Sequence, residues 1–345
     1  MAFPVDQAVS RSGQYNSSGD SRELYLKLFG GEVLTSFHSE NLALSLTRVK
    51  TISQGKSYSF PLLGKNRAKY HTPGQLIDTN KIAHTERLVT IDDIAIATVF
   101  VAEIDEAIAH YDSRSVYSME NGEALAEMVD RKCFRMIAKA AFITSASLAA
   151  AAGLKVIADE PYTSNIQLAV AGDENDGSKI ADAIFKARTQ FKLAKIKEKP
   201  VVVLPPEQYE ALINLKTTDV AYVNRDTGGA GSVSEGTVAR IAGFTIYEST
   251  NLPQEDESLA LADGEAVPLS IAEGGSGNES KYFGDYSKVV GLIFSQSAMA
   301  TVKLIDVTSK VIDEDLRLGS TMLSKLAVGH DILRPCCAIA ILKSV

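Results

Sequence analysis

A chain of 345 residues with 45% apolar side chains can bury a sizeable core, and its length predicts two domains or one domain with a large insertion. Its 35 basic and 43 acidic side chains give a net charge of −8, which favours solubility and argues against wholesale wrapping of nucleic acid. A local basic patch is compatible with that balance.

The composition also argues against a membrane-spanning or disulfide-stabilised chain. The N-terminal residues carry no basic region followed by an apolar run, so no secretory signal is expected. The longest uncharged stretch, residues 140–154, is shorter than the roughly 20 apolar residues that span a bilayer, so no membrane partner is expected. Cys133, Cys336 and Cys337 form no even framework and no CxxC motif, which predicts free, buried thiols in a reducing compartment.

The chain begins with a polar segment. Residues 1–22 are rich in Ser, Gly, Gln and Asn, which predicts a mobile arm that gains order through contact. Apolar residues return between Leu24 and Phe37, but Gly30 and Gly31 interrupt any helix there. The arm is therefore expected to lack a core of its own.

Two long alternating runs follow the arm. Thr51–Gly64 predicts a strand with small hydroxyl side chains on one face. The other face carries one lysine and four apolar residues: Lys56, Ile52, Tyr58, Phe60 and Leu62. The polar stretch 65–80 predicts a tip of sixteen residues, and a second run begins at Lys81 and continues through Phe100. No tight turn joins the two runs into a compact hairpin.

The length of these runs matters for function. A strand of fourteen residues spans roughly 45 Å, whereas a compact chain of this size has a radius of gyration of about 20 Å, so the predicted strand pair would project beyond its own body. An isolated two-stranded ribbon is marginally stable in water, and a projecting apolar stripe is an aggregation hazard or a binding surface. The alternative is that both runs belong to an ordinary sheet.

Charge gives this region a second distinguishing feature. Between residues 51 and 86 the only acids are Asp78 and Glu86. The bases are five in number: Lys56, Lys65, Arg67, Lys69 and Lys81. Such a locally basic stretch in an acidic protein is either a solvated face or a fit to an acidic surface on another copy of the chain.

The strongest helical pattern covers residues 101–149. Leu125, Met128, Met136 and Ala140 recur at helical spacings, with acids early and bases late in the segment, which suits the helix dipole. Gly122 is a candidate bend or break in this helix.

A mixed region of helices and strands comes next. Ser178 is the candidate cap of a helix that ends before Pro200, and one face of this helix is predicted to carry Ile180, Ile184, Ala187 and Phe191. Residues 201–205 predict a buried strand. Residues 205–215 predict a third helix, and residues 238–250 predict a strand broken at Gly243. Residues 254–285 carry eight acids and one base and predict an exposed acidic loop. The C-terminal part supplies apolar strands around one short helical interval.

Several stretches resemble active-site motifs, but each lacks a residue that its chemistry requires. The glycines of "GSVSEGTV" have phosphate-loop spacing, yet Thr237 occupies the lysine position. "DENDGS" has its glycine one position too early for a calcium loop. No paired histidine spacing supports zinc, no GxSxG elbow supports a serine nucleophile, and no aromatic-basic cluster supports nucleic-acid reading. No cofactor, metal or enzymatic activity is therefore expected.

Six collinear stretches resemble one known family. They are "LKLFGGEVLTSF", "TRVKTISQGKSYSFPLLGK", "KIAHTERLVTIDD", "AIAHYDSRSVYS", "SAMATVKLIDV" and "LAVGHDILRP". They look like the major capsid proteins of T-seven-like (autographivirus) short-tailed phages. The resemblance covers most of Leu26–Pro335 and is weaker between about residues 150 and 240.

The resemblance implies an α+β chain with the Hong Kong 97-type capsid fold. It implies an N-terminal arm at 1–50, an extended loop at 51–88, and a peripheral domain at 89–164 whose spine helix covers 105–149. An axial domain at 165–298 and returning peripheral strands at 299–345 complete the expected organisation.

The same resemblance implies what the extended loop does. It would lie across a neighbouring subunit, so Ile52, Tyr58, Phe60 and Leu62 would complete their burial between chains, with Lys56, Lys65, Arg67 and Lys69 beside them. Some relatives weld this loop to a neighbour through a lysine–asparagine bond, and Lys65, Lys69 and Asn66 have the required groups. The short-tailed phages do not use the weld, so non-covalent closure is expected.

The implied function is mechanical: many copies pack into an icosahedral phage head around double-stranded DNA. The implied partners are other copies of the chain in pentamers and hexamers, a scaffolding protein, portal and tail proteins, and DNA bound without sequence specificity. The expected location is the virion, with the host cytoplasm during assembly. Two alternatives stay open at this point, namely the shell of a cellular nanocompartment and a mixed α/β enzyme.

Overall fold

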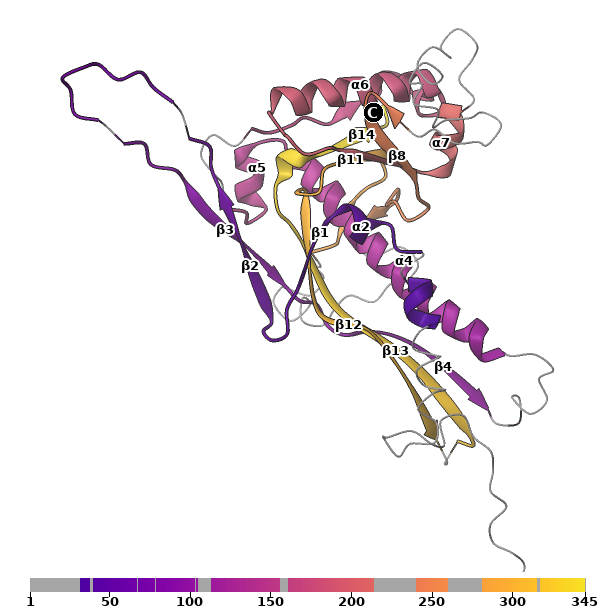
Figure 1. Cartoon of the computed structure of the whole chain (residues 1–345). Helices are drawn as coiled ribbons and strands as arrows, with labels where there is room; N and C mark the ends of the chain where they lie inside the picture. Colours follow the sequence, from indigo (N-terminus) through magenta and orange to yellow (C-terminus); the bar gives the residue numbers. More distant parts are fainter. Residues whose placement is uncertain are drawn as a thin grey trace, which may run out of the picture. The chain divides into compact units, whose positions relative to one another are not determined.

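The computed structural model, drawn in Figure 1, divides into two compact units. It describes residues 32–37, 40–66, 68–77, 79–102, 104, 113–155, 161–213, 240–259, 281–314 and 317–344. The first unit comprises Met1–Asn41, Ile94–Met128 and Ile305–Ala327, and the second comprises Leu42–Asp93, Val129–Leu304 and Val328–Val345. Three long elements contribute residues to both units: helix α4 (Ser113–Phe142) and strands β12 (Met299–Glu314) and β13 (Gly319–Ile332).

The described strands form two larger sheets and two ribbons, which confirms the expected α+β class. The four-stranded sheet has the order β1-β12-β13-β4, and the six-stranded sheet has the order β5-β14-β11-β6-β8-β7. The ribbons are β2-β3 and β9-β10. The short strands among these are β1 (Arg48–Thr51), β5 (Ile166–Gln167), β7 (Arg240–Ile241), β9 (Asp256–Glu257) and β10 (Gly284–Asp285).

In the first unit, an antiparallel strand pair packs a small apolar core. β4 (Ala95–Ala102) runs antiparallel to β13, from the pair Gly319 and Ala102 to the pair Leu326 and Ala95. Val33, from the helical segment at 32–37, is buried together with Val101 of β4 and Met322 of β13. These residues place the core of this unit on one face of the strand pair.

The long helix does not break at Gly122. A Cβ atom at this position would lie 2.7 Å from the Val33 carbonyl oxygen and 2.8 Å from Ser36 Cβ, so only glycine fits. Ser36 Oγ also donates a hydrogen bond of 2.9 Å to the Met119 carbonyl oxygen. The glycine therefore serves a close contact with the segment at 33–37 rather than a bend.

The predicted helical region at 105–149 is divided. Of the part that the structure describes, α4 ends at Phe142, and a separate helix α5 (Ala146–Ala151) begins after Ser145, whose side chain accepts a hydrogen bond from the Leu148 amide. Residues 105–112 lie outside the described part of the chain. At about 1.5 Å per residue, the 30 residues of α4 extend about 45 Å.

In the second unit, the six-stranded sheet carries the main apolar core. The strands β6 (Val201–Leu204), β11 (Val289–Phe294) and β14 (Ala338–Leu342) are nearly all apolar, as expected of strands covered on both faces. In β8 (Phe244–Glu248), only Phe244 and Ile246 are buried. Helix α6 (Gly177–Leu193) contributes Ile180, Ile184, Ala187 and Phe191 to this core. These are the four residues that the helical spacing predicts, so the predicted face is confirmed.

Details of this region correct two of the predicted boundaries. The cap of α6 is Asp176, whose carboxylate accepts a 2.9 Å hydrogen bond from the Ser178 amide, so the prediction of Ser178 as the cap is wrong. The predicted strand at 238–250 is a tight hairpin of β7 and β8, because Ala242 and Gly243 turn the chain at φ values of 54° and 80°. The buried strand at 201–204 is confirmed, and so is a helix within the predicted 205–215, α7 (Pro206–Ile213).

The remaining predictions concern the C-terminal strands, the domain boundaries and segments that lie outside the described residues. The C-terminal strand β14 lies in the six-stranded sheet beside β11 and β5, so residues 299–345 contribute to both larger sheets. The boundaries drawn between arm, loop, peripheral and axial domains stay a prediction. The polar arm at 1–22, the "GSVSEGTV" stretch and residues 260–280 of the acidic loop lie outside the described residues.

Candidate intersubunit surface

The predicted ribbon exists, but it is shorter than its sequence pattern. β2 (Ser57–Leu63) and β3 (His84–Thr90) pair antiparallel and form a two-stranded sheet of their own (Figure 1). Seven residues span about 23 Å, half of the expected length. The prediction of one continuous strand over 51–64 is wrong, because β1 pairs separately with β12, and Ile52 and Lys56 lie in the turn between β1 and β2. That turn includes Gly55, whose φ of 104° is unfavourable for other residues.

The apolar face of the ribbon is buried by the chain itself. Phe60 is only 2% exposed and Leu62 only 3% exposed, and Tyr58 is half-buried. The Tyr58 and Phe60 rings meet edge to face at 4.9 Å, and the Arg48 guanidinium lies 5.3 Å from the centre of the Phe60 ring. The expectation that Phe60 and Leu62 complete their burial on a neighbouring subunit is therefore wrong. Their cover comes from residues that the sequence pattern alone does not bring together.

Polar contacts fasten the ribbon to the rest of its unit. Arg334 donates a 3.2 Å hydrogen bond to the Leu63 carbonyl oxygen, and Lys65 Nζ donates one of the same length to the Ala194 carbonyl oxygen. Buried Arg87, which pairs with Phe60 across the ribbon, donates to the Leu333 carbonyl oxygen at 3.4 Å. Lys65 thus has a role within the chain.

The basic residues predicted for the interface are distributed unevenly. Lys56, Lys65 and Lys69 are exposed, whereas Arg67 lies outside the described residues. Exposed Glu86 meets Lys155 at 3.3 Å and Ser59 Oγ at 2.8 Å. The hydrogen bond from Ser59 lowers the pKa of Glu86, and Lys155 lowers it further.

The opposite face and the tip carry the apolar side chains that remain exposed. Leu63 and Leu88 are 55% and 56% exposed on the outer face of the ribbon. Among the tip residues between the strands, three large apolar side chains are exposed: Tyr70, Leu76 and Ile77. Sequence reasoning missed these five residues, because it followed the longest alternating stripe and treated the tip as polar. The tip residues could have been recognised from the sequence, because they are large apolar residues among turn-forming ones.

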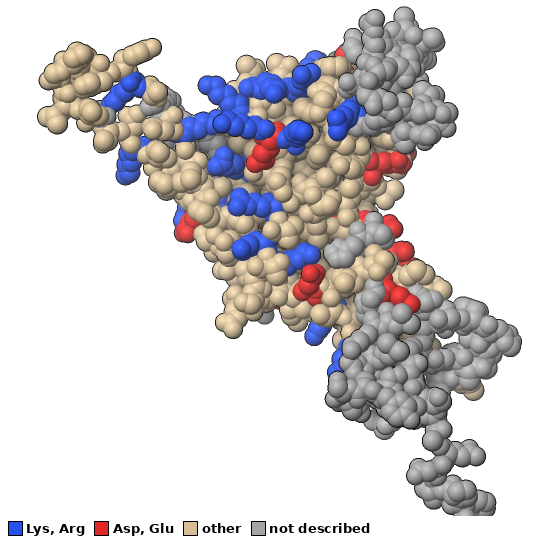
Figure 2. All heavy atoms as spheres, viewed as in Figure 1, with Lys and Arg blue, Asp and Glu red and all other residues tan. Residues whose placement is uncertain are grey.

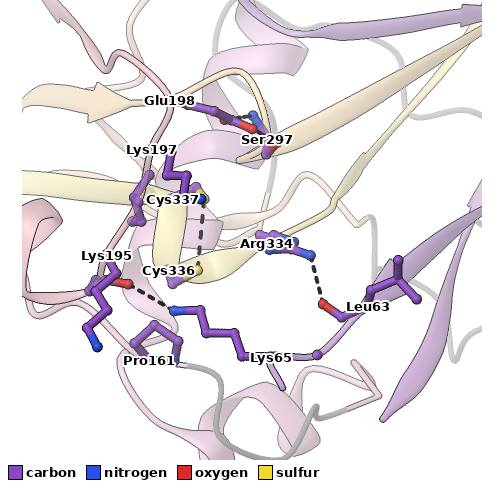
Figure 3. Close-up of a pocket in the computed structure, with 13 residues that line it drawn as sticks. Leu63, Lys65, Pro161, Lys195, Lys197, Glu198, Ser297, Arg334, Cys336 and Cys337 are labelled. Carbon is purple, nitrogen blue, oxygen red and sulfur yellow. Dashed lines mark hydrogen bonds between the residues drawn. The ribbon is translucent and has the colours of Figure 1, made fainter. Parts of the chain in front are cut away.

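A cavity of about 270 Å³ lies at the end of the ribbon where β2 leads into the tip (Figure 3). Its lining comes from the end of β2, the loop after α6, and the turn η3 (Pro335–Cys337) with its flanks. The residues involved are 63–65, 194–198, Pro161, Ser297, Arg334, Cys336 and Cys337. The two thiol sulfurs lie 3.8 Å apart, and the hydrogen bond from Cys336 lowers the pKa of Cys337 despite burial. All three cysteines are buried and free.

Basic side chains gather around this part of the second unit. Figure 2 shows Lys and Arg concentrated over the region where Figure 1 places α6. Residues 177–199 contain seven basic and two acidic side chains. The exposed bases are Lys179, Lys186, Arg188, Lys192, Lys195, Lys197 and Lys199. The acidic protein therefore carries a local basic surface, as its overall charge balance allows.

The described residues contain no cluster of three or more His, Cys, Asp or Glu side chains placed to hold a metal ion. Within the same part of the chain, no helix combines the length and the hydropathy needed to cross a bilayer.

Comparison with known proteins decides the family. The model of the Gp10A-like major capsid protein family matches residues 59–342. The major capsid protein of Escherichia phage T7 is 31% identical over 334 residues, which cover 95% of this chain and 94% of the relative. This chain belongs to the Gp10A-like major capsid protein family. The major capsid protein of Enterobacteria phage T3 is 28% identical over 97% of this chain and 96% of its own length.

Solved structures agree with the fold expected of a Gp10A-like protein. The capsid structure of the cyanophage P-SCSP1u matches with a TM-score of 0.70 and 32% identity, covering 97% of this chain and 98% of that chain. The mature capsid of bacteriophage PhiM1 matches with a TM-score of 0.64 at 16% identity over 88% of this chain and 87% of that one, which shows the fold alone. The predicted Hong Kong 97-type capsid fold and the resemblance to T7-like capsid proteins are confirmed.

The comparisons also settle the main role of the chain. As a Gp10A-like major capsid protein, it forms a shell with copies of itself and is part of the phage virion. A virus-like particle from Pyrococcus furiosus shares the fold at a TM-score of 0.52 and 13% identity, covering 92% of this chain and 99% of that one. At that identity only the fold is shared, so the nanocompartment alternative is not favoured. The family is structural, which points away from the enzyme alternative.

Proposed function

We propose that this chain closes the icosahedral head of a short-tailed phage around double-stranded DNA through non-covalent contacts of its β2-β3 ribbon and N-terminal arm. Family membership carries the shell-forming part of this proposal. The intersubunit role of the ribbon is supported by the five apolar side chains that the isolated chain leaves exposed on it. Lys56 and Lys69 flank them and suit an acidic surface on the neighbouring copy.

The energetics favour this arrangement. Burying a leucine or isoleucine side chain stabilises a contact by about 1.5–3 kcal/mol. Covering the exposed side chains of one ribbon with a neighbouring subunit thus stabilises the contact by several kcal/mol. The free energy needed to order the tip reduces this gain. Because every subunit in a closed shell makes several such contacts, each contact can be modest and the assembly still stable.

The acidic surface of the chain as a whole suits a container for DNA. With a net charge of −8, the wall does not bind its polyanionic cargo uniformly. Assembly would take place in the host cytoplasm with a scaffolding protein, and portal and tail proteins would complete the particle. Nuclease-protected double-stranded DNA inside purified particles supports this assignment, and particles that enclose only protein contradict it.

The ribbon contact is tested by placing charge on the tip. The double variant Leu76→Asp and Ile77→Asp removes two exposed apolar side chains, whereas Gln75→Asp introduces a charge at the neighbouring exposed position. We expect both proteins to fold, as judged by circular dichroism, because none of the three residues is buried. Only the double variant should fail to form shells in negative-stain images and in sedimentation velocity.

The control fixes how the result is interpreted. Loss of shells in both variants would indicate that any charge at the tip blocks assembly and would leave no special role for the apolar side chains. Normal shells in the double variant would contradict the proposed contact while leaving the capsid role intact.

A further inference from the structure

The cavity at the tip end of the ribbon concentrates positive charge. Four cationic side chains line it, namely Lys65, Lys195, Lys197 and Arg334, against one acid, Glu198. Glu198 is already engaged, since its carboxylate accepts hydrogen bonds from the Ser297 amide at 3.0 Å and from Ser297 Oγ. The lining therefore has a local charge of about +3 in a protein whose net charge is −8.

The cations have free donor capacity. The side-chain amines of Lys195 and Lys197 have no hydrogen-bond or ion-pair partner among the described residues. Lys65 and Arg334 each use one donor on a backbone carbonyl oxygen, as Figure 3 shows, although an ammonium has three N–H groups and a guanidinium has five. Clustering like charges in a concave site is unfavourable unless an anion compensates them.

We propose that this cavity is a binding site for a phosphate group. A carboxylate brings one negative charge, whereas a phosphate ester brings about −1.5 to −2 and three strong acceptor oxygens, which matches several cations better. A volume of about 270 Å³ has room for roughly nine waters, enough for a phosphate or a short polyphosphate with some hydration. The same chemistry is offered by free phosphates and by the terminal phosphate of a nucleic acid strand.

Binding would have a structural consequence. The cavity joins three segments distant in sequence: the end of β2 at residues 63–65, the loop at 194–198, and the turn at 334–337. A phosphate held by Lys65, Lys195 and Arg334 would bridge these segments and fasten the ribbon at the end of β2. This role is independent of any contact that the ribbon makes with another subunit.

The first measurement is thermal stability of the full chain at constant ionic strength. Sodium phosphate, sodium tripolyphosphate and a short 5′-phosphorylated DNA duplex are compared with sodium chloride. We expect a saturable rise in melting temperature of roughly 3 °C or more with at least one phosphate probe. The variant Lys195→Ala/Lys197→Ala should lose this rise. Lys186→Ala/Lys192→Ala, which removes two exposed lysines of α6 outside the cavity, should keep it.

The second measurement locates the ligand. Cys336 and Cys337 line the cavity, whereas buried Cys133 does not, so the three thiols form an internal comparison. A saturating phosphate probe should slow alkylation of Cys336 and Cys337 by iodoacetamide, read by peptide mass spectrometry, without changing Cys133.

The outcomes distinguish a small-anion site from a site for a nucleic acid terminus. A stability rise with free phosphates assigns a small-anion site, and a rise with the duplex alone assigns a nucleic acid terminus. Equal melting temperatures in chloride and in all three phosphate probes would overturn the proposal, and so would a rise that survives in Lys195→Ala/Lys197→Ala. Neither measurement requires shells, so failure here is distinguishable from failure of the proposed capsid contacts.

Discussion

At the scale of single residues, burial separates the two faces of the ribbon. Phe60 and Leu62 belong to the core of their own chain, whereas Leu63 and Leu88 on the other face stay more than half exposed. The alternation in the sequence predicts that such a division exists. The alternation does not show which residues cover the apolar face, because Arg48 and Leu333 reach it only through tertiary contacts.

This division predicts effects of very different size on the two faces of the ribbon. Phe60→Ala should destabilise the subunit by about 3–5 kcal/mol, because it removes a buried ring and leaves a cavity. Leu63→Ala should change the free energy of unfolding by less than about 0.5 kcal/mol. Urea denaturation of dissociated subunits measures both. A small effect of Phe60→Ala would show that the ring is not covered within the isolated chain.

Asp130 is a second residue whose environment determines its behaviour. Its two carboxylate oxygens accept hydrogen bonds from the Leu42 and Ala43 amides at 2.9 and 3.0 Å, and they cap helix α2 (Ala43–Leu46) from a distant part of the sequence. Burial raises the pKa of Asp130 from 3.8 to about 6, while the two hydrogen bonds partly oppose that shift. Asp130 therefore binds its proton more tightly in the folded chain than in the unfolded chain.

The sign of the resulting pH dependence is definite. Because the folded pKa is raised, the stabilising contribution is fully present below about pH 3.8 and is lost as pH rises through about 6, a change of roughly 3 kcal/mol. Relative to the wild type, Asp130→Asn should therefore become more stable as pH increases from 4 to 7. Melting temperatures across this range test it, with exposed Glu127→Gln as the control. A constant difference between Asp130→Asn and wild type would contradict the raised pKa.

At the scale of elements, periodicity predicted helices and buried strands better than it predicted their ends. The inward face of α6 and the strand at 201–204 follow from local spacing, since each is formed by residues close in sequence. The division of 51–64 into β1, a turn and β2 depends on pairing with β12, whose residues lie about 250 positions later. The exposed apolar tip was missed because composition alone does not say which side chains a loop leaves uncovered.

Gly329 is a position where a close contact with a distant segment requires glycine. A Cβ atom on this residue of β13 would lie 2.0 Å from the Thr90 carbonyl oxygen and 2.7 Å from Ile91 Cα, at the end of β3. Both neighbours are backbone atoms and cannot move aside easily. Glycine therefore allows the base of the ribbon to lie directly against β13.

The corresponding prediction concerns both stability and local order. Gly329→Ala should destabilise the subunit by about 1–3 kcal/mol or more, and it should speed hydrogen exchange in β3, because the strand must shift to admit the methyl group. Lys325→Ala, at a half-buried position of β13, is the control and should have little effect. Unchanged exchange rates in β3 would show that the contact at Thr90 is not a constraint.

At the scale of the whole molecule, charge and apolar surface are distributed unequally along the chain. The net charge is −8, yet residues 177–199 are strongly basic and the cavity beside them is lined by four cations. The exposed apolar side chains of the second unit include those of the ribbon and its tip. Such a chain combines an acidic exterior with local surfaces suited to specific contacts, as a shell subunit requires.

The last prediction concerns how the shell is held closed. Lys65 and Lys69 are exposed, and Lys65 Nζ already donates to the Ala194 carbonyl oxygen. Asn66 is exposed and accepts a 3.4 Å hydrogen bond from Asn80. A lysine–asparagine bond requires the amine to be held against the amide carbonyl while ammonia leaves, and these exposed side chains are not held in that way within the chain. In mature particles boiled in detergent, the capsid protein should therefore run as one band at 37.0 kDa, with no larger covalent oligomers. A ladder of covalent oligomers that disappears in Lys65→Arg or Lys69→Arg would show that the ribbon is welded to its neighbour.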